Sequence, residues 1–165
     1  TRTSKRLASN EGIRLLELSL RFALEGREGK PIGTVFLLGN VRNLRQMTRP
    51  LILNPLSGHP SSARSIFNPD FLETIRELSA LDGAFLVNTR GGVEQAGVYL
   101  DAPPSKQIRV GEGLGSRHVA AATITAQTNA IAFVISESSG RVSVFTDGAA
   151  VMELDARVVN QATGA

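Results

Sequence analysis

The dominant hydrophobic period of this sequence changes near residue 84, from mainly helical to mainly strand-like, and this change limits the folds that the chain can adopt. Before it, apolar residues recur three and four positions apart, as at Ile13, Leu16 and Leu20, which predicts amphipathic helices. After it, short apolar runs are separated by turn residues, which is typical of strands. One Ala-rich stretch, 117–127, interrupts these strands with helix-forming residues. This order favours an α/β (α+β) fold in which a central mixed, largely antiparallel β-sheet is flanked by α-helices.

Caps and turns give the limits of the expected elements. Ser9 and Asn10 begin a first helix that stops at Gly26, and Asn68-Pro69 begins a second helix that ends near Ala80. Strands are expected at 33–38, 51–53, 84–87, 93–100, 130–135, 141–146 and 150–154. The segments 54–65 and 101–114 are rich in loop-forming residues, and the stretch 42–49 has no clear preference.

The length allows one domain with a hydrophobic core. The chain has 165 residues, of which 42% are hydrophobic and 20% charged. We expect a connector at 1–8, a single domain at 9–160 and a tail at 161–165, and the opening Thr1 indicates a piece of a longer protein. The longest apolar run, Ala130 to Ile135, is too short to cross a bilayer, so we expect a cytoplasmic protein without a membrane partner.

The side-chain inventory limits the chemistry. The sequence has no cysteine and two histidines. A disulfide framework, a thiolate nucleophile and a cysteine-type zinc site are excluded, and a histidine-rich metal centre is not expected. A metal ion would have to be held mainly by oxygen atoms, which favours Mg²⁺ or Mn²⁺ with a substrate that carries phosphates.

Positive charge is concentrated in the first part of the sequence. Residues 1–50 carry ten Lys and Arg against four Asp and Glu, whereas residues 51–165 carry eight against eleven. A nucleic-acid groove usually spreads basic residues along one element with aromatic residues between them, and aromatic residues are only 5% of this chain. The composition therefore argues against direct nucleic-acid binding and leaves a linker or docking face as the role of the basic end.

A glycine-rich segment before the helix predicted at 117–127 is the first candidate site. It reads Gly111-Glu112-Gly113-Leu114-Gly115-Ser116-Arg117-His118. Backbone N–H groups and the positive end of the helix dipole suit an anion, and Ser116, Arg117 and His118 add a hydroxyl and two cationic groups. The spacing matches neither a Walker A loop nor a dinucleotide fingerprint. Two interpretations stay open here: a phosphate site, or a flexible loop in which Ser116 only caps the helix.

Two carboxylates stand beside predicted strands. Asp82-Gly83-Ala84 leads into the strand at 84–87, and Ser136-Glu137-Ser138 follows the strand at 130–135. Taken singly, each is explained by an ordinary turn or a solvated strand end. Together with an anion-binding loop they are the parts needed for metal-assisted phosphoryl transfer, in which carboxylates hold a divalent ion and the loop holds phosphate.

Three blocks of the sequence carry a family resemblance. They are Asp82-Gly83-Ala84, then Gly115-Ser116-Arg117-His118 before the Ala-rich helix, then Ser136-Glu137 with Gly140 before the next strand. In order and spacing they resemble the signature blocks of the diadenylate cyclase (DAC) family, over roughly residues 33–154. Leu53-Asn54-Pro55, and the segment 136–140 followed by Val144-Phe145, are most similar to the archaeal-type branch.

The resemblance implies a single DAC-type domain and a reaction. Two ATP molecules would condense into cyclic di-3′,5′-AMP with release of two pyrophosphates, assisted by Mn²⁺ or Mg²⁺. In that family each protomer binds one ATP, and each 3′-hydroxyl attacks the α-phosphate of the nucleotide in the facing site. A homo-oligomer that contains a facing dimer is implied, because in-line attack needs both nucleotides held at once.

The resemblance also implies roles for individual residues. Asp82 would bind the metal and help to deprotonate the attacking hydroxyl, and Glu137 would be the second metal-side carboxylate. Arg117 and His118 would neutralise charge on the triphosphate during catalysis. Adenine would lie near Tyr99 and Leu100. The residues implied to contact the nucleotide are Gly83, Ala84, Leu100, Gly115, Ser116, Arg117, His118 and Ser136.

Three positions depart from patterns of the family. The commoner bacterial pattern has Thr where Ser116 stands and a second Arg where Val119 stands, and family members often carry a second acid where Ser138 stands. These changes leave room for a slow or silenced enzyme, so a module that binds and senses ATP or the cyclic product is the alternative function. A third interpretation, a nucleic-acid-binding domain, predicts steeply salt-dependent affinity that is indifferent to Asp82.

Overall fold

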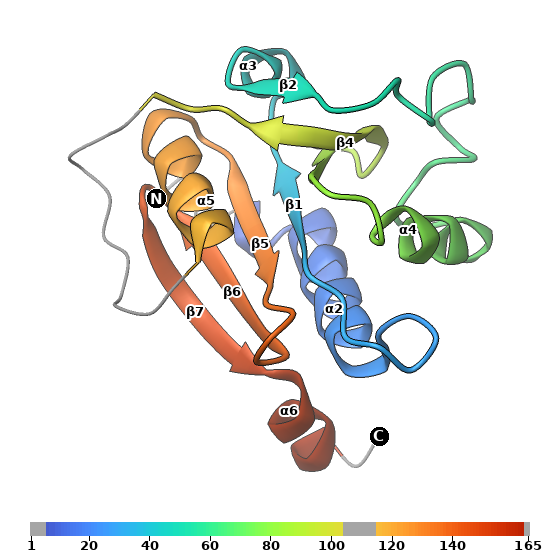
Figure 1. Cartoon of the computed structure of the whole chain (residues 1–165), viewed down its shortest axis with the longest axis vertical. Coiled ribbons are helices and arrows are strands. Elements are labelled where there is room, and N and C mark those ends of the chain that lie inside the picture. Colours follow the sequence, from blue (N-terminus) through green and yellow to red (C-terminus); the bar gives the residue numbers. More distant parts are fainter. Residues whose placement is uncertain (1–5, 104–114, 164–165) are drawn as a thin grey trace.

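A mixed β-sheet forms the centre of the molecule, with helices on both of its faces (Figure 1). The structure is a computed structural model and describes residues 6–103 and 115–163. Seven strands in this part of the chain follow the order β2-β4-β3-β1-β5-β6-β7, and all neighbours are antiparallel except β1 and β3. The strands are β1 Thr34–Leu38, β2 Thr48–Pro50, β3 Ala84–Val87, β4 Val93–Leu100, β5 Ile131–Ile135, β6 Arg141–Thr146 and β7 Ala149–Asp155. The helices are α2 Asn10–Glu25, α3 Val41–Arg45, η1 Pro69–Phe71, α4 Leu72–Leu78, α5 Ser116–Gln127 and α6 Ala156–Thr163.

This architecture confirms the predicted fold class, a largely antiparallel mixed sheet flanked by helices. The predicted caps are confirmed as well. The Ser9 hydroxyl accepts a hydrogen bond from the Gly12 N–H at 3.1 Å and begins α2, which ends where Gly26 takes a φ of +63°. Asn68 caps the short η1 helix through the Asp70 N–H and so starts the second predicted helical segment.

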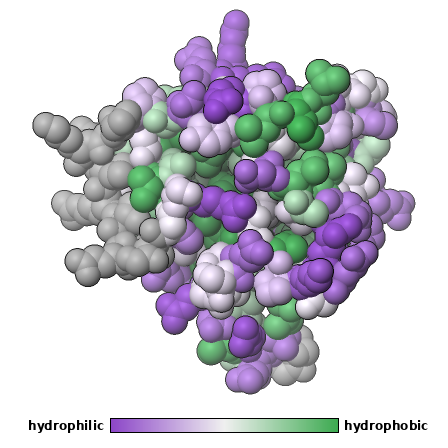
Figure 2. All heavy atoms as spheres, in the orientation of Figure 1, coloured by the Kyte–Doolittle hydropathy of each residue, from purple (hydrophilic) through white to green (hydrophobic). Residues whose placement is uncertain are grey.

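One hydrophobic cluster packs on each face of the sheet. On one face, α2 places Phe22 against Phe36, and Phe36 stacks on Phe85 with ring centroids 5.0 Å apart. On the other face, α5 packs small residues such as Ala121 and Ala122 against the sheet. Since β1, β3 and β5 are buried at every position, these central strands read as continuous apolar runs. On the face seen in Figure 2, the exposed apolar side chains lie in small groups among polar ones.

The strand predicted at 51–53 is wrong. The edge strand β2 lies just before it, where Arg49 pairs with Tyr99 of β4, and Leu53 is 95% exposed. Backbone bonding to β4 ends with the hydrogen bond that the Leu51 N–H donates to the Gly97 carbonyl at 2.9 Å, where Gly97 has a φ of +68° and lies against the side chain of Ile52. An edge strand is solvated on one side, so it does not need a run of apolar residues such as the one that predicted a strand at 51–53.

Two helices were not predicted. α3 begins at Asn40, whose side chain accepts a hydrogen bond from the Asn43 N–H, and it occupies the stretch left unassigned. α6 follows β7 without a loop and leaves Val158 60% exposed, so its helical pattern is short and weakly buried. No helix in the two described ranges is long and apolar enough to span a membrane.

Candidate functional site

The strand order brings three segments that are distant in sequence to one edge of the sheet. β1 lies between β3, to which it is parallel, and β5, to which it is antiparallel. The starts of β1 and β3 and the end of β5 therefore lie side by side. Gly33 precedes β1, Asp82 and Gly83 precede β3, and Ser136 and Glu137 follow β5. Topology alone thus gathers two of the three blocks singled out in the sequence.

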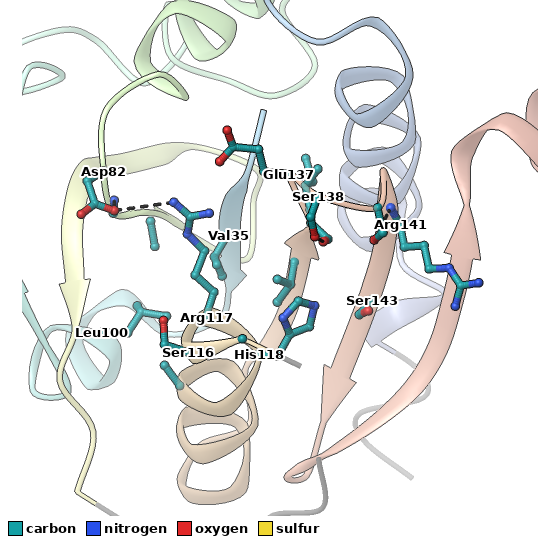
Figure 3. A pocket seen from close by; sticks show the side chains of 18 of the residues that line it. Val35, Asp82, Leu100, Ser116, Arg117, His118, Glu137, Ser138, Arg141 and Ser143 are labelled. Carbon is teal, nitrogen blue, oxygen red and sulfur yellow. Dashed lines mark hydrogen bonds and ion pairs between the residues drawn. The ribbon is translucent and has the colours of Figure 1, made fainter. Parts of the chain in front are cut away.

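A cleft of about 1190 Å³ lies at this edge, and the first turn of α5 brings the third block into it (Figure 3). Every residue with an expected role lines this cleft: Asp82, Gly83, Ala84, Leu100, Gly115, Ser116, Arg117, His118, Ser136 and Glu137. Tyr99 lines it too, whereas Gly111 to Leu114 of the glycine-rich segment lie outside the described residues. The structure brings the expected set together, and the role of each member stays a prediction.

The helix α5 begins at the cleft. Gly115 is its N-cap and offers no side chain to bond the first-turn amides. The positive end of the helix dipole and these N–H groups are therefore available to an anionic ligand. Ser116 is exposed at the first helical position, so the interpretation in which it only caps the helix is wrong.

Asp82 lies at the open side of the cleft. One of its oxygens, Oδ1, accepts a hydrogen bond from the Gly83 N–H at 3.0 Å and lies 3.6 Å from Nη2 of Arg117. The Asp82 side chain remains 85% exposed, so its carboxylate is accessible to a ligand. Gly83 has a φ of +109°, and a Cβ there would lie 2.8 Å from the carbonyl oxygen of Val98. Glycine is needed at this position because the backbone passes directly against β4.

His118 forms part of the cleft wall, with 7% of its surface exposed. Its ring meets Phe145 edge-on, with centroids 6.1 Å apart. Burial lowers the pKa of His118; Glu153 acts in the opposite direction, and the positive charge of Arg117 lowers the pKa further. The imidazole is therefore mainly neutral at pH 7 and offers one N–H donor to a ligand.

Asp82, Glu137 and Glu153 are the carboxylates that line the cleft, and the first two are those expected from the sequence to hold a divalent cation. Within residues 6–103 and 115–163, no group of three His, Asp or Glu side chains is placed to hold a metal ion. Mg²⁺ commonly takes only one or two carboxylates together with substrate phosphates, and it keeps several waters. This donor set therefore fits an ion that is bound jointly by the protein and a phosphorylated substrate.

The sequence analysis missed Arg141, Ser143 and Glu153, which line the cleft, and Gly33, which borders Arg117 and Glu137. Ser143 is a serine in the middle of an apolar strand, 3% exposed; it lines the cleft, and its hydroxyl makes no hydrogen bond within the described chain. Its position between Val142 and Val144 was the available signal, because a buried hydroxyl normally has a partner. Gly33 gave no chemical signal, and only the packing around it shows that it belongs to the site.

The fold and the cleft define an α/β protein with a site suited to a nucleotide or another phosphate-bearing ligand. Comparison with known proteins gives the family. The family model described as "DisA bacterial checkpoint controller nucleotide-binding", abbreviated DAC, matches residues 21–150. The chain belongs to this diadenylate cyclase family, which confirms the resemblance noted in the sequence.

Two curated relatives come from archaea, in agreement with the archaeal-type features of the sequence. A protein named diadenylate cyclase from Methanocaldococcus jannaschii is 44% identical over 143 residues, which is 87% of this chain and 45% of the relative. One of the same name from Haloferax volcanii is 34% identical over 141 residues, 86% of this chain and 51% of the relative. The chain thus spans about half the length of these relatives.

Solved structures share the fold at lower identity. A DacA variant from Staphylococcus aureus superimposes with a TM-score of 0.54 at 19% identity, covering 92% of this chain and 91% of that one. A protein from Bacillus cereus described as a hypothetical membrane spanning protein gives a TM-score of 0.53 at 22% identity, covering 85% of this chain and 61% of that one. These similarities support the fold class.

Proposed function

We propose that this domain condenses two ATP molecules into cyclic di-3′,5′-AMP and two pyrophosphates. The observation that carries the proposal is the convergence, in one cleft, of Asp82, the first turn of α5 with Arg117, and Glu137. Membership of the diadenylate cyclase family supports ATP as the substrate and a condensation to the cyclic dinucleotide as the reaction. The activity is proposed here for a chain that spans about half of each curated relative.

The residues of the cleft divide into a phosphate end and a base end. The first turn of α5 would bind the triphosphate through backbone N–H groups, the Ser116 hydroxyl and the Arg117 guanidinium. His118 would add a hydrogen bond from its neutral ring. Adenine would lie toward Leu100 and Tyr99 at the end of β4, both of which line the cleft.

In the reaction, the 3′-oxygen of one nucleotide forms a bond to the α-phosphorus of the other while the bond to pyrophosphate breaks. Asp82 would accept the proton of the attacking hydroxyl, since its carboxylate is exposed on the cleft side. Arg117 would stabilise the charge that develops on the departing pyrophosphate. A divalent ion held by Asp82 and Glu137, Mn²⁺ or Mg²⁺, supplies charge neutralisation on the phosphates when bound.

Two such transfers are needed to close the cyclic product. We propose that two copies of the domain face each other within a homo-oligomer, each holding one ATP, because one two-fold arrangement then provides both bonds with the same geometry. We also propose that the domain acts in the cytoplasm, as expected from the sequence.

The test is an incubation of purified protein with ATP and either Mg²⁺ or Mn²⁺ at several protein concentrations, with mass detection of the product. Wild-type protein should form cyclic di-AMP, and Asp82→Asn should abolish turnover while largely sparing ATP binding. Asp101→Asn is a matched control, because Asp101 is also exposed and lies 3.8 Å from an arginine, Arg49, but does not line the cleft. Turnover by the Asp82→Asn protein at the wild-type rate would contradict the proposal.

A second candidate is a nucleotide-sensing module. The observation in its favour is that Asp82 already pairs with Arg117, while Ser138 occupies a position where family members often carry an acid. Equal ATP binding by the wild-type and Asp82→Asn proteins, with turnover by neither under Mg²⁺ or Mn²⁺, would favour this function.

A further inference from the structure

Gly33 is a glycine whose backbone does not require glycine. It precedes β1, and it is absent from the glycines with positive φ, such as Gly83 and Gly97. A residue with a side chain could therefore adopt its backbone conformation without strain. The reason for glycine at this position must lie in the space around it.

The space where a side chain would begin is filled by the site. A Cβ on Gly33 would lie 2.5 Å from Nη1 of Arg117, 3.0 Å from Cβ of Glu137 and 3.3 Å from the Glu137 backbone nitrogen. Nη2 of the same guanidinium lies 3.6 Å from Asp82. Arg117 thus passes over Gly33 and comes close to the residues that carry both carboxylates.

The topology explains why this position matters. β1 lies between β3 and β5, so the residue before β1 lies between the segment that carries Asp82 and the segment that carries Glu137. A side chain at position 33 would stand in the path by which Arg117 reaches across the sheet edge from α5. The guanidinium would have to move, because it is the flexible end of its side chain while the β1 backbone is fixed by pairing on both sides.

We propose that Gly33 is a positioning residue, which by lacking a side chain leaves the slot in which the Arg117 guanidinium lies between Asp82 and Glu137. The inference rests on the proposed function, in which Arg117 binds the triphosphate. It gives Gly33 a role in the geometry of the site.

Gly33→Ala tests this inference, with Gly39→Ala as the matched control at the other end of β1. Gly39 also lacks a positive φ, but its Cβ would lie 3.1 Å from Cβ of Ala130, outside the cleft. We expect Gly33→Ala to weaken ATP binding by about tenfold, the size of one charge-assisted hydrogen bond. Both variants should lower Tm to a similar extent, because each new Cβ lies 3.0–3.1 Å from another Cβ, but Gly39→Ala should leave ATP affinity unchanged. Unchanged ATP affinity in Gly33→Ala, or an equal loss of affinity in both variants, would overturn the inference.

A double-mutant cycle with Arg117→Ala separates positioning from a structural effect. If Gly33 acts through the guanidinium, Gly33→Ala has no further effect on ATP affinity once Arg117 is alanine. A fall in Tm caused by the contacts of the new methyl group with Glu137 would remain in both backgrounds, so ATP affinity is the readout that separates the two effects. Equal losses of ATP affinity in both backgrounds would refute a role through Arg117.

A crystal structure of the Gly33→Ala protein gives a readout that does not depend on the proposed function. It should show the guanidinium displaced from its place beside Asp82, with β1 unmoved. An unmoved guanidinium refutes the inference. If the wild-type protein neither binds nor converts ATP but the displacement is seen, the proposed function fails and the positioning role stands.

Discussion

The Arg117→Ala variant separates the contribution of this side chain to ATP affinity from its contribution to the free energy of unfolding. In the structure Arg117 pairs with Asp82 at 3.6 Å, and the two side chains are 37% and 85% exposed. An ion pair this exposed contributes roughly 0–1 kcal/mol to the free energy of unfolding. In a domain of this size about 1 kcal/mol corresponds to about 2–4 °C in Tm, so Tm should fall by only a few degrees.

The expected effect on binding is much larger. Hydrogen bonds from a charged donor contribute about 1.5–3 kcal/mol, which corresponds to roughly 10–100-fold in Kd. Titration calorimetry with ATP and thermal unfolding of the same samples measure the two effects separately. Arg117→Lys keeps the charge but loses the planar fork, so its affinity should lie between those of the wild type and the alanine variant.

Arg21→Ala is the control for removal of an arginine from an ion pair. Arg21 lies 3.2 Å from Glu25 on α2, with side chains 49% and 41% exposed, and neither residue lines the cleft. It should change Tm as little as Arg117→Ala and leave the affinity for ATP unchanged. Unchanged ATP affinity in Arg117→Ala together with a large fall in Tm would refute the assignment of this side chain to phosphate binding.

Two further predictions follow from buried groups in the cleft wall. Because burial lowers the pKa of His118, the unfolded chain binds more protons than the native chain as pH falls below about 6.5. The Tm of the wild-type protein should therefore decrease in this range, and the Tm of His118→Gln should decrease less. Thermal unfolding at several pH values measures both slopes. An equal slope in both proteins would exclude His118 as the source. Ser143→Ala should leave Tm nearly unchanged, since its hydroxyl has no partner within the described chain, but should weaken ATP binding several-fold in calorimetry. A marked loss of Tm with normal ATP affinity would instead make the serine structural.

The sequence predicts individual helices and strands of this fold better than it predicts how the strands pair. Central strands such as β1 and β5 are buried on both faces, so their apolar runs were unambiguous. The edge strand β2 was misplaced because solvation on one side removes that signal, and Leu51 to Leu53 carried the apolar run instead. Backbone pairing with β4 decided the position of β2, and pairing leaves no pattern in a single segment.

The same distinction holds for the site. Residues whose chemistry is carried by their own side chains, such as Asp82 and Arg117, were found from their type and spacing. In the proposal, Gly33 acts through the absence of a side chain. Its importance depends on the position of β1 between β3 and β5, which cannot be predicted from the residues around position 33. Ser143 is intermediate, because a polar residue in an apolar strand is visible in the sequence, while the absence of a partner for its hydroxyl among residues 6–103 and 115–163 is visible only in the fold.

The exposure of Asp82 bears on why the proposed reaction would need a second copy. If Asp82 is the base, as proposed, its side chain is 85% exposed in the single domain and would be as accessible to water as to a ribose hydroxyl. In the proposed facing arrangement the partner's nucleotide would occupy the position from which water attacks. The product formed per protein molecule should therefore rise with protein concentration until the dimer is saturated, without release of AMP. Steady release of AMP and pyrophosphate at a specific rate independent of concentration would mean that Asp82 serves a hydrolase, and the facing arrangement would be refuted.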